Sequence, residues 1–304
     1  MSITSFRVNS IIGEPSMKNN LSRRLLGTLL ILIPLFAATV PARQDKTARP
    51  DPSASQAAGR NRIFIASLNM HGELNPEKVL QEFDRHERLR RTDIFLLQEV
   101  EGDPRKCRAL VDRLAGALGL PFVHMPDEAQ SMGNGDGLAT VSRYRLKETV
   151  VIPLKHFDLV IRSRRRIALA QTVETPAGNI RLFNLHLDSR VNPEQRLDQL
   201  STVLAAADSE TRPVIIGGDF NTADYRWVSH VLPIPEKRSQ RDALLKRMAA
   251  SGFQTPFESA GPTHDRLGLQ LDWLFFRKLQ AWAAGTQEIE FSDHHAIWAQ
   301  FGPP

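Results

Sequence analysis

Residues that could bind a cation or move a proton stand at the ends of several apolar stretches in this chain. The clearest case is residues 214–222, VIIGGDFNT, where three apolar β-formers run into two glycines, followed by Asp219 and Asn221. This pattern predicts a buried strand with an acid and an amide at its C-terminal end, and glycines that allow a close backbone approach. Taken alone, the pair suits a turn cap as well as a site that grips something charged.

The same arrangement recurs at other predicted strand ends. The residues concerned are Asn69, Glu99, His186, Asp219, Asn221, Asp272, Asp293 and His294. Each one has an ordinary explanation: an acid at a strand end can be salt-bridged, and a lone inward histidine is more often a hydrogen-bonded core residue. Strand ends of stacked sheets can converge on one rim, however, so together these residues predict a single site.

The residue types at this rim are those that metal-assisted phosphoester hydrolysis requires. Hard oxygen ligands hold Mg²⁺ or Mn²⁺, and we assign Glu99 first, then Asn69 and Asp293, to that role. His294 paired with Asp272 can take a proton from water. The remaining three, Asp219, Asn221 and His186, would orient the nucleophile and stabilise charge on the phosphoryl oxygens.

Other candidate residues have two interpretations each. Arg143 and Arg190 could hold phosphate oxygens or could pair with acids. Residues 162–166, RSRRR, form either a solvated loop before a strand or an anion-attracting rim. We expect His264 and His295 to be structural residues of the rim. The glycine-rich residues 131–137 lack the spacing of a phosphate-binding loop and predict a hairpin turn.

Charge and cysteine content narrow the function class. The 304 residues carry a net charge of +5. The first 42 hold four basic side chains and one acid, which leaves +2 for the rest, too little to indicate a nucleic-acid surface. The single cysteine, Cys107, excludes a disulfide within the chain and is expected to be a buried thiol. No Cys/His spacing typical of zinc is present.

The N-terminus has the pattern of a targeting segment. Lys18, Arg23 and Arg24 precede an apolar run over residues 25–40, and small residues follow at the spacing of a signal-peptidase site. We expect residues 1–42 to be a signal peptide or a membrane anchor, with an internal core helix as the third possibility. Residues 43–60 predict a flexible linker and 61–304 the catalytic domain. The protein is therefore expected to be exported, periplasmic or secreted, or else anchored to a membrane through residues 25–40.

The remaining chain alternates predicted strands and helices. Helices are expected after Asn75, with Pro76 in the first turn, and over 104–118, 193–207, 225–230 and 237–250. Strands are expected over 62–68, 92–100, 138–143, 214–219 and 271–276, with a hairpin over 167–187 and a last strand near 296. This order predicts an α/β sandwich with mixed sheets.

Seven segments in order support a family resemblance over about residues 62–301. They are SLNMHG, LLQEV, LATVSRY, FNLHLD, GGDFNT, LDWLFF and SDHHAIWA. The chain resembles the endonuclease/exonuclease/phosphatase superfamily, whose fold is like that of deoxyribonuclease I. The resemblance implies a four-layer α/β sandwich, two packed mixed sheets with helices outside, and divalent-metal hydrolysis of phosphoesters. The chain departs from the pattern at His295, where the family usually has proline.

The resemblance also implies a role for each matching residue. Glu99 is the principal metal ligand, Asn69 the amide near the metal, and Asp293 the adjacent acid. His186 contacts the scissile phosphate. Asp219 and Asn221 position the nucleophile and the phosphate, and Asp272 orients the catalytic His294. The number of metal ions, one or two, stays open.

These observations lead to the hypothesis of an exported, Mg²⁺-dependent phosphodiesterase that acts by in-line attack of water. The alternatives are a phosphomonoesterase, a phospholipid hydrolase of the sphingomyelinase type, and a non-catalytic binding module. The substrate would be nucleic acid, phospholipid or a small phosphodiester, and we expect the protein to be a monomer.

Overall fold

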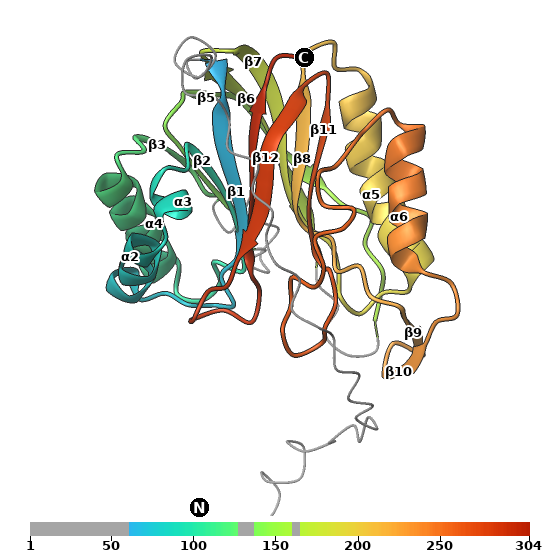
Figure 1. Ribbon diagram of the computed structural model, residues 1–304. Helices are drawn as coiled ribbons and strands as arrows, with labels where there is room; N and C mark the ends of the chain where they lie inside the picture. Colours follow the sequence, from blue (N-terminus) through green and yellow to red (C-terminus); the bar gives the residue numbers. More distant parts are fainter. Residues whose placement is uncertain (1–60, 127–136, 160–164) are drawn as a thin grey trace, which may run out of the picture. The chain divides into compact units, whose positions relative to one another are not determined.

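The computed structural model describes residues 61–126, 137–159 and 165–304 (Figure 1). The predicted leader, the linker, residues 131–136 of the glycine-rich turn and residues 162–164 of the basic run lie outside these ranges. Within the described ranges, no helix combines the length and the apolar character needed to cross a bilayer.

Two β-sheets form the centre of the described structure. The first contains, in spatial order, β12 (Gln280–Gln287), β13 (Ala296–Gly302), β1 (Ile63–Asn69), β2 (Ile94–Gln98), β4 (Ala139–Ser142) and β3 (Phe122–His124). The second contains β11 (Asp272–Arg277), β8 (Val214–Asp219), β7 (Gly178–His186), β6 (Ile167–Thr175) and β5 (Leu146–Pro153). Each sheet has one parallel pair, β1 with β2 and β7 with β8, among antiparallel neighbours. The prediction of two mixed sheets is confirmed.

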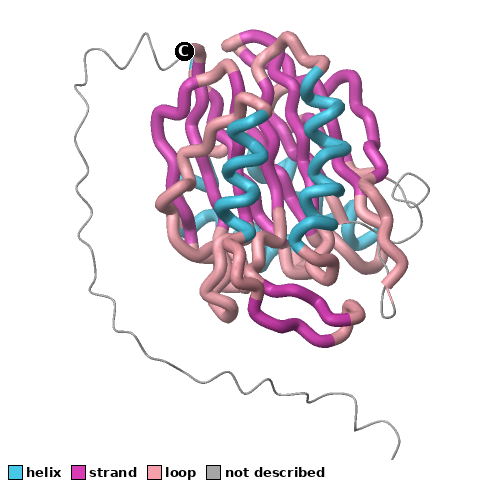
Figure 2. The backbone as a smooth tube through the Cα atoms, turned by 90° about the vertical axis from the view of Figure 1, so that its right-hand side faces the viewer, coloured by secondary structure: helices cyan, strands magenta, loops and turns pink. Residues whose placement is uncertain are grey.

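Helices cover the outer face of each sheet, which completes the predicted four layers (Figures 1 and 2). The first sheet carries α2 (Pro76–Arg85), the short α3 (Glu87–Arg90) and α4 (Pro104–Leu118), and the second carries α5 (Pro193–Asp208) and α6 (Gln240–Ala250). Asn75 caps α2 as expected, because its side chain accepts hydrogen bonds from the backbone of Glu77 and Lys78. Cys107, on the inner face of α4, is buried, as predicted.

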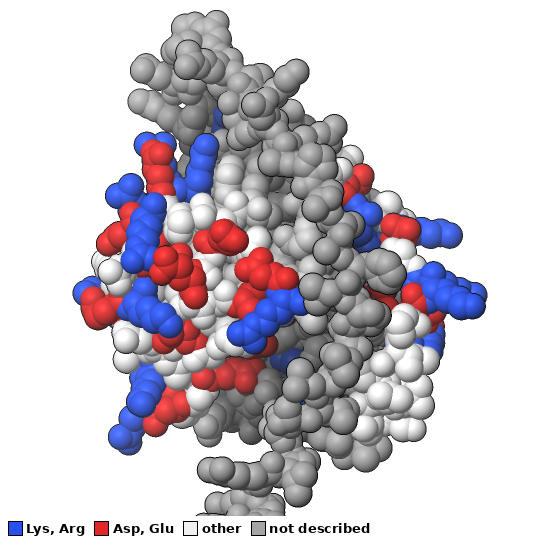
Figure 3. All heavy atoms as spheres, turned by 60° about the horizontal axis from the view of Figure 1, so that its bottom comes forward, with Lys and Arg blue, Asp and Glu red and all other residues white. Residues whose placement is uncertain are grey.

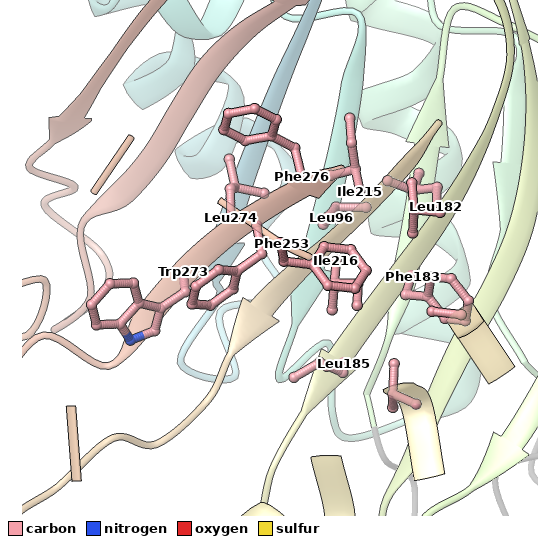
Figure 4. Packing of buried hydrophobic residues seen from close by; sticks show 14 of the residues in the cluster. Leu96, Leu182, Phe183, Leu185, Ile215, Ile216, Phe253, Trp273, Leu274 and Phe276 are labelled. Atoms are coloured by element: carbon pink, nitrogen blue, oxygen red, sulfur yellow. The ribbon is translucent and has the colours of Figure 1, made fainter. Parts of the chain in front are cut away.

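The core between the two sheets is apolar. Leu96 of the first sheet lies among Leu182, Ile215 and Leu274 of the second (Figure 4). Burial of each such side chain stabilises the fold by about 1.5–3 kcal/mol. These contacts hold the two sheets together and thereby bring their strand ends to a common edge.

A polar contact also joins the two sheets close to that edge. The side-chain amide of Gln98, at the end of β2, donates to Asn184 Oδ1 of β7 over 2.8 Å. Asn184 Nδ2 in turn donates to the carbonyls of Leu97 and Ala139 in the first sheet. Because buried amides need partners, this network favours one alignment of the two sheets.

The two glycines of β8 are required by their surroundings. A Cβ on Gly217 would lie 2.7 Å from Leu96 Cδ1 of the facing sheet, and it would also collide with Leu274. Gly218 has a φ of 142°, and a Cβ there would collide with the carbonyl oxygen of Leu185 in β7. The close approach predicted from the glycine pair is therefore present.

The short helix predicted over 225–230 is wrong. Residues Tyr225–Val228 form β9, which pairs antiparallel with β10, Leu232–Pro235, in a separate two-stranded hairpin. Aromatic and β-branched residues favour strands, two prolines in β10 cannot continue a helix, and Ser229 and His230 adopt left-handed backbone at the turn.

Candidate active site

The predicted site residues lie at one edge of the sandwich because of strand direction. In the parallel pair β1 and β2, Asn69 is the last residue of β1 and Glu99 directly follows β2. In the parallel pair β7 and β8, His186 and Asp219 are the last residues. In β11, which runs antiparallel to β8, Asp272 lies opposite Asp219. Asp293 and His294 come just before β13, which runs antiparallel to β1. The strand ends therefore bring the eight residues to the same edge of the sandwich.

A buried carboxylate–imidazole pair occupies the centre of this edge. His294 Nδ1 lies 2.8 Å from Asp272 Oδ2, and both side chains are almost inaccessible to solvent. The hydroxyl of Thr263 donates to the same Asp272 oxygen over 2.6 Å and accepts from the Asp272 backbone. The pair is thus fixed in orientation, with His294 Nε2 as the ring nitrogen turned away from Asp272.

The acids around His294 determine its protonation. Burial lowers the pKa of His294, but the charge and hydrogen bond of Asp272, helped by Asp219 and Asp293, outweigh burial and raise it to about 10. Without a cation the ring is therefore charged at neutral pH. Negative charge at this edge exceeds what one imidazolium balances, which is the condition that favours binding of a further cation.

Asp219 connects the imidazoles to Asn69. Its Oδ2 lies 3.0 Å from Asn69 Nδ2, 3.5 Å from His186 Nε2 and 4.0 Å from His294 Nε2. Burial raises the pKa of Asp219, with Asp272 acting in the same direction and His294 against it. An oxygen that touches an amide and two imidazoles is well placed to orient a water molecule or a phosphoryl group.

Asn221 is held by its backbone. It has a φ of 50°, its N–H donates to Asp219 Oδ1 over 2.8 Å, and its side-chain amide donates to the Leu187 carbonyl over 2.9 Å. The buried Arg196 of α5 donates to the Asn221 carbonyl. The turn after β8 is therefore bonded both to the loop after β7 and to the helix behind it.

Glu99 and His186 come from different sheets and face each other across the edge. Their closest atoms, Glu99 Oε1 and His186 Nε2, are 3.9 Å apart, and Glu99 keeps about a third of its side chain exposed. Arg166 Nη1 lies 3.0 Å from His186 Nδ1. A guanidinium can only donate, so Nδ1 must accept, and the proton of a neutral His186 is on Nε2, directed at Glu99 and Asp219. His186 is thus a hydrogen-bond donor and not a base.

Asp293 lies among histidines. Its Oδ1 is 3.0 Å from His71 Nδ1 and its Oδ2 is 3.5 Å from His264 Nε2. The His264 ring also packs edge-on against His294, with ring centroids 4.8 Å apart. His264 is therefore part of the wall of the site itself, closer to the catalytic residues than its predicted place on the rim.

The donor set fits a hard divalent cation. The charged partners found for Glu99, Asp219, Asp272 and Asp293 in the described part of the chain are imidazoles, without a lysine or arginine in ion-pair contact. Asp272 Oδ1 is buried and receives no hydrogen bond from described residues, whereas Asp293 Oδ1 has His71 Nδ1 3.0 Å away. Two sets of three potential ligands occur here, His264–Asp293–His294 and Asp219–Asp272–His294. Glu99 belongs to neither set. Its described ion-pair partner is His186, which lies near Asp219, and Asp219 in turn accepts a hydrogen bond from Asn69.

The two arginines considered for phosphate binding, Arg143 and Arg190, differ in position. Arg143 pairs with Asp93 over 2.8 Å at the N-terminal end of β2, whereas Glu99 follows the opposite end. The acid-pairing interpretation is the one the structure shows, and Arg143 is not at this edge. Arg190 lies in the loop after β7 on the side of the site, and its guanidinium makes no ion pair with the described residues.

Sequence reasoning missed two supporting residues. Arg166 is buried, so the solvated-loop interpretation of the basic run is wrong for this position. The hairpin register brings it only close to this position: Ala168 pairs with Leu185, so Ile167 lies opposite His186 and Arg166 is the next residue along the chain. Thr263 carried no comparable signal, because its contact with Asp272 depends on the path of a loop.

Comparison with known proteins shows the family and structures of similar fold. A profile of the Endonuclease/Exonuclease/phosphatase family matches residues 66–294. An endonuclease/exonuclease/phosphatase from Beutenbergia cavernae is similar in structure, with a TM-score of 0.60 and 19% identity over 80% of this chain and 72% of that one. ANGEL2, a 2′,3′-cyclic phosphatase, has a TM-score of 0.54 and 15% identity over 80% of this chain and 96% of its own.

Relatives by sequence match a shorter stretch. The UPF0294 protein VV2535 of Vibrio vulnificus is 28% identical over 125 residues, 40% of this chain. That match spans about two fifths of the relative, 39% of its length.

Proposed function

This chain belongs to the endonuclease/exonuclease/phosphatase family, whose members hydrolyse phosphoester bonds, and from that premise we propose that it is an exported, divalent-metal-dependent phosphodiesterase. The observation that carries the proposal is the buried pair of Asp272 and His294, 2.8 Å apart, whose second ring nitrogen faces Asp219.

The residues of the chain divide the chemistry among them. Asp219 and Asn69 orient a water molecule beside His294 Nε2, which receives the proton as water attacks phosphorus. Asp272, held by Thr263, keeps Nδ1 protonated and stabilises the imidazolium that forms. His186 donates from Nε2 to a phosphoryl oxygen, and Arg166 maintains that tautomer. Mg²⁺ or Mn²⁺ bound by Glu99, Asn69 and Asp293 would neutralise charge on the phosphate and offset the acids that hold His294 charged.

A substrate panel tests the proposal. The purified full chain is assayed on bis(p-nitrophenyl) phosphate, p-nitrophenyl phosphate, plasmid DNA, RNA and sphingomyelin, with Mg²⁺, Mn²⁺ or chelator. We expect diester hydrolysis that chelator abolishes, and His294→Ala should reduce turnover about 10²–10⁴-fold. His295→Ala is the matched control, because His295 pairs with Asp265 outside the site. Turnover that survives in chelator or in His294→Ala would reject the mechanism. Preference for the monoester would favour a phosphomonoesterase, and no turnover of any substrate would favour a binding module.

Export rests on the apolar run of residues 25–40 and needs its own test. Residues 1–60 fused to alkaline phosphatase, a reporter that is active only after export, should give activity in whole bacteria. Mass spectrometry of the mature fusion would then distinguish a cleaved signal peptide from an anchor. An inactive, cytosolic fusion would reject export.

A further inference from the structure

The β9–β10 hairpin exposes a concentration of apolar side chains. Val228, Val231, Leu232 and Ile234 are 47%, 50%, 53% and 38% exposed. They are four of the seven large hydrophobic residues that the described part of the chain exposes to this degree. Isolated exposed apolar residues are common on soluble domains, but four within one short hairpin indicate a surface that binds an apolar partner or phase.

The hairpin is a convex projection. Its two strands pair only with each other, and Figure 2 shows them projecting below the sheets. From Tyr225 to Pro235 the sequence has no acid, and its one arginine, Arg226, is neutralised by Glu194 and Glu236. Figure 3 looks toward this end of the domain, and largely uncharged surface occupies its lower right, the side where the hairpin lies in Figure 1.

The hairpin is bonded through one side, strand β9 and the turn, to the loop at the catalytic edge. Trp227 donates from its backbone to Asn192 Oδ1 over 2.6 Å and from its indole to the Ser189 carbonyl over 3.0 Å. The His230 ring lies 3.2 Å from the carbonyl of Arg190. All three partners are in the loop that follows His186. An isolated two-stranded hairpin is only marginally stable in water, so these contacts fix its position next to the site.

We propose that this hairpin inserts its tip into a phospholipid bilayer, so that the substrate of the neighbouring site is the phosphoester of a membrane lipid. The proposal rests on the proposed function and names its substrate class. A protein partner would be expected to offer its apolar surface to a groove or a flat patch, whereas a narrow projecting tip without acids suits insertion between lipids. Exposed Lys237 and Arg238 directly follow the hairpin and match the phosphates of lipid headgroups.

A fluorescent label at the tip tests insertion directly. The only native thiol, Cys107, is buried, so Leu232→Cys can be labelled selectively with the environment-sensitive dye NBD in the full chain. The matched control is Val150→Cys, which is 49% exposed on β5. Vesicles of phosphatidylcholine and phosphatidylglycerol should blue-shift and brighten the label at 232 and leave the label at 150 unchanged. Because each label reports its own position, binding by the N-terminal segment cannot produce this difference.

Three outcomes would overturn the proposal. The first is an equal response, or none, at both positions. The second is a blue shift at 232 before vesicles are added, which would mean that the chain covers its own hairpin. The third is a shift that depends on protein concentration without lipid, which would mean that a second copy does so.

Hydrolysis separates this proposal from the one it rests on. Val231→Glu with Leu232→Glu should lower the ratio of vesicle-lipid to soluble-diester turnover by about tenfold or more, because burying a charge opposes insertion. Val150→Glu should leave the ratio unchanged. An unchanged ratio in the hairpin variant would overturn lipid docking, while absence of soluble-diester turnover in the unaltered protein would instead reject the phosphodiesterase.

Discussion

Replacement of Asp272 by asparagine would test the central pair of the site. The amide is nearly the same size as the carboxylate, and Thr263 can still donate to its oxygen, so the packing around His294 should change little. The substitution removes the charge next to His294 Nδ1. Loss of the orienting carboxylate should lower kcat about 10³–10⁴-fold, because the imidazole loses both its fixed tautomer and its stabilised charged form.

The size of the electrostatic effect follows from the pKa of His294. Its rise from the ordinary 6.5 to about 10 corresponds to about 5 kcal/mol in favour of the charged ring, at about 1.4 kcal/mol per pH unit. Because the folded-state pKa is raised, this stability is fully present below about pH 6.5 and is lost as pH rises toward 10. Asp219, whose pKa burial raises to about 7, also makes stability fall as pH rises, but in the lower range between 3.8 and about 7.

Denaturant unfolding of the chelator-treated protein at several pH values measures this effect. The free energy of unfolding should fall by up to about 1.4 kcal/mol per pH unit between 6.5 and 10, and the fall should be much shallower in Asp272→Asn. Asp265→Asn is the control, since it removes the carboxylate 2.6 Å from His295 outside the site. NMR titration of the His294 ring gives its pKa independently. An Asp272→Asn protein with kcat within tenfold of the original, or with an unchanged His294 pKa, would refute the reasoning.

Three further predictions concern the cation, the donor histidine and the backbone. Glu99→Gln should weaken binding of Mn²⁺, measured by calorimetry, at least tenfold. Because a bound ion stabilises the fold, chelator should lower the melting temperature of the original protein but not that of the variant. Arg166→Met should lower kcat about tenfold to a hundredfold while KM changes little, because His186 can then adopt either tautomer; an unchanged kcat would refute this. Gly218→Ala should destabilise the domain by about 3 kcal/mol or more in denaturant unfolding, because its Cβ would collide with the Leu185 carbonyl, and a change below 1 kcal/mol would contradict the packing described.

Regular patterns in the sequence predicted most of the fold. The apolar run before Asp219 forms the predicted strand, and the predicted helix follows its cap at Asn75. Helix α4 matches its predicted range over Pro104–Leu118. The 225–230 segment failed because the helix interpretation ignored its β-formers and the prolines that follow. Strand β12, Gln280–Gln287, went unpredicted because its alanines and partial exposure give no β-period; its pairing with β13 is a tertiary effect.

The site was predictable to the extent that strand ends could be located. Register, which the sequence pattern specifies for buried strands, places Asp272 opposite Asp219, and packing of the two sheets brings His294 to this pair. The contacts of His264 with Asp293 and His294 depend instead on how a long loop folds back over the edge, and no local period encodes such a path. Arg166 lies between these cases, since the register places it next to the residue opposite His186, but its burial could not be read from a run of basic residues.

Glu99 shows how the fold and the chemistry can oppose each other. Its φ of 52° belongs to a region where a side chain costs about 1–2 kcal/mol and glycine costs little. Laboratory evolution for heat resistance in the presence of chelator, where no bound ion adds stability, should therefore tend to replace this glutamate with glycine, whereas selection for turnover should retain it. The position would then act as an indicator of which pressure a population has experienced, and thermostable variants of this domain should be sequenced there first.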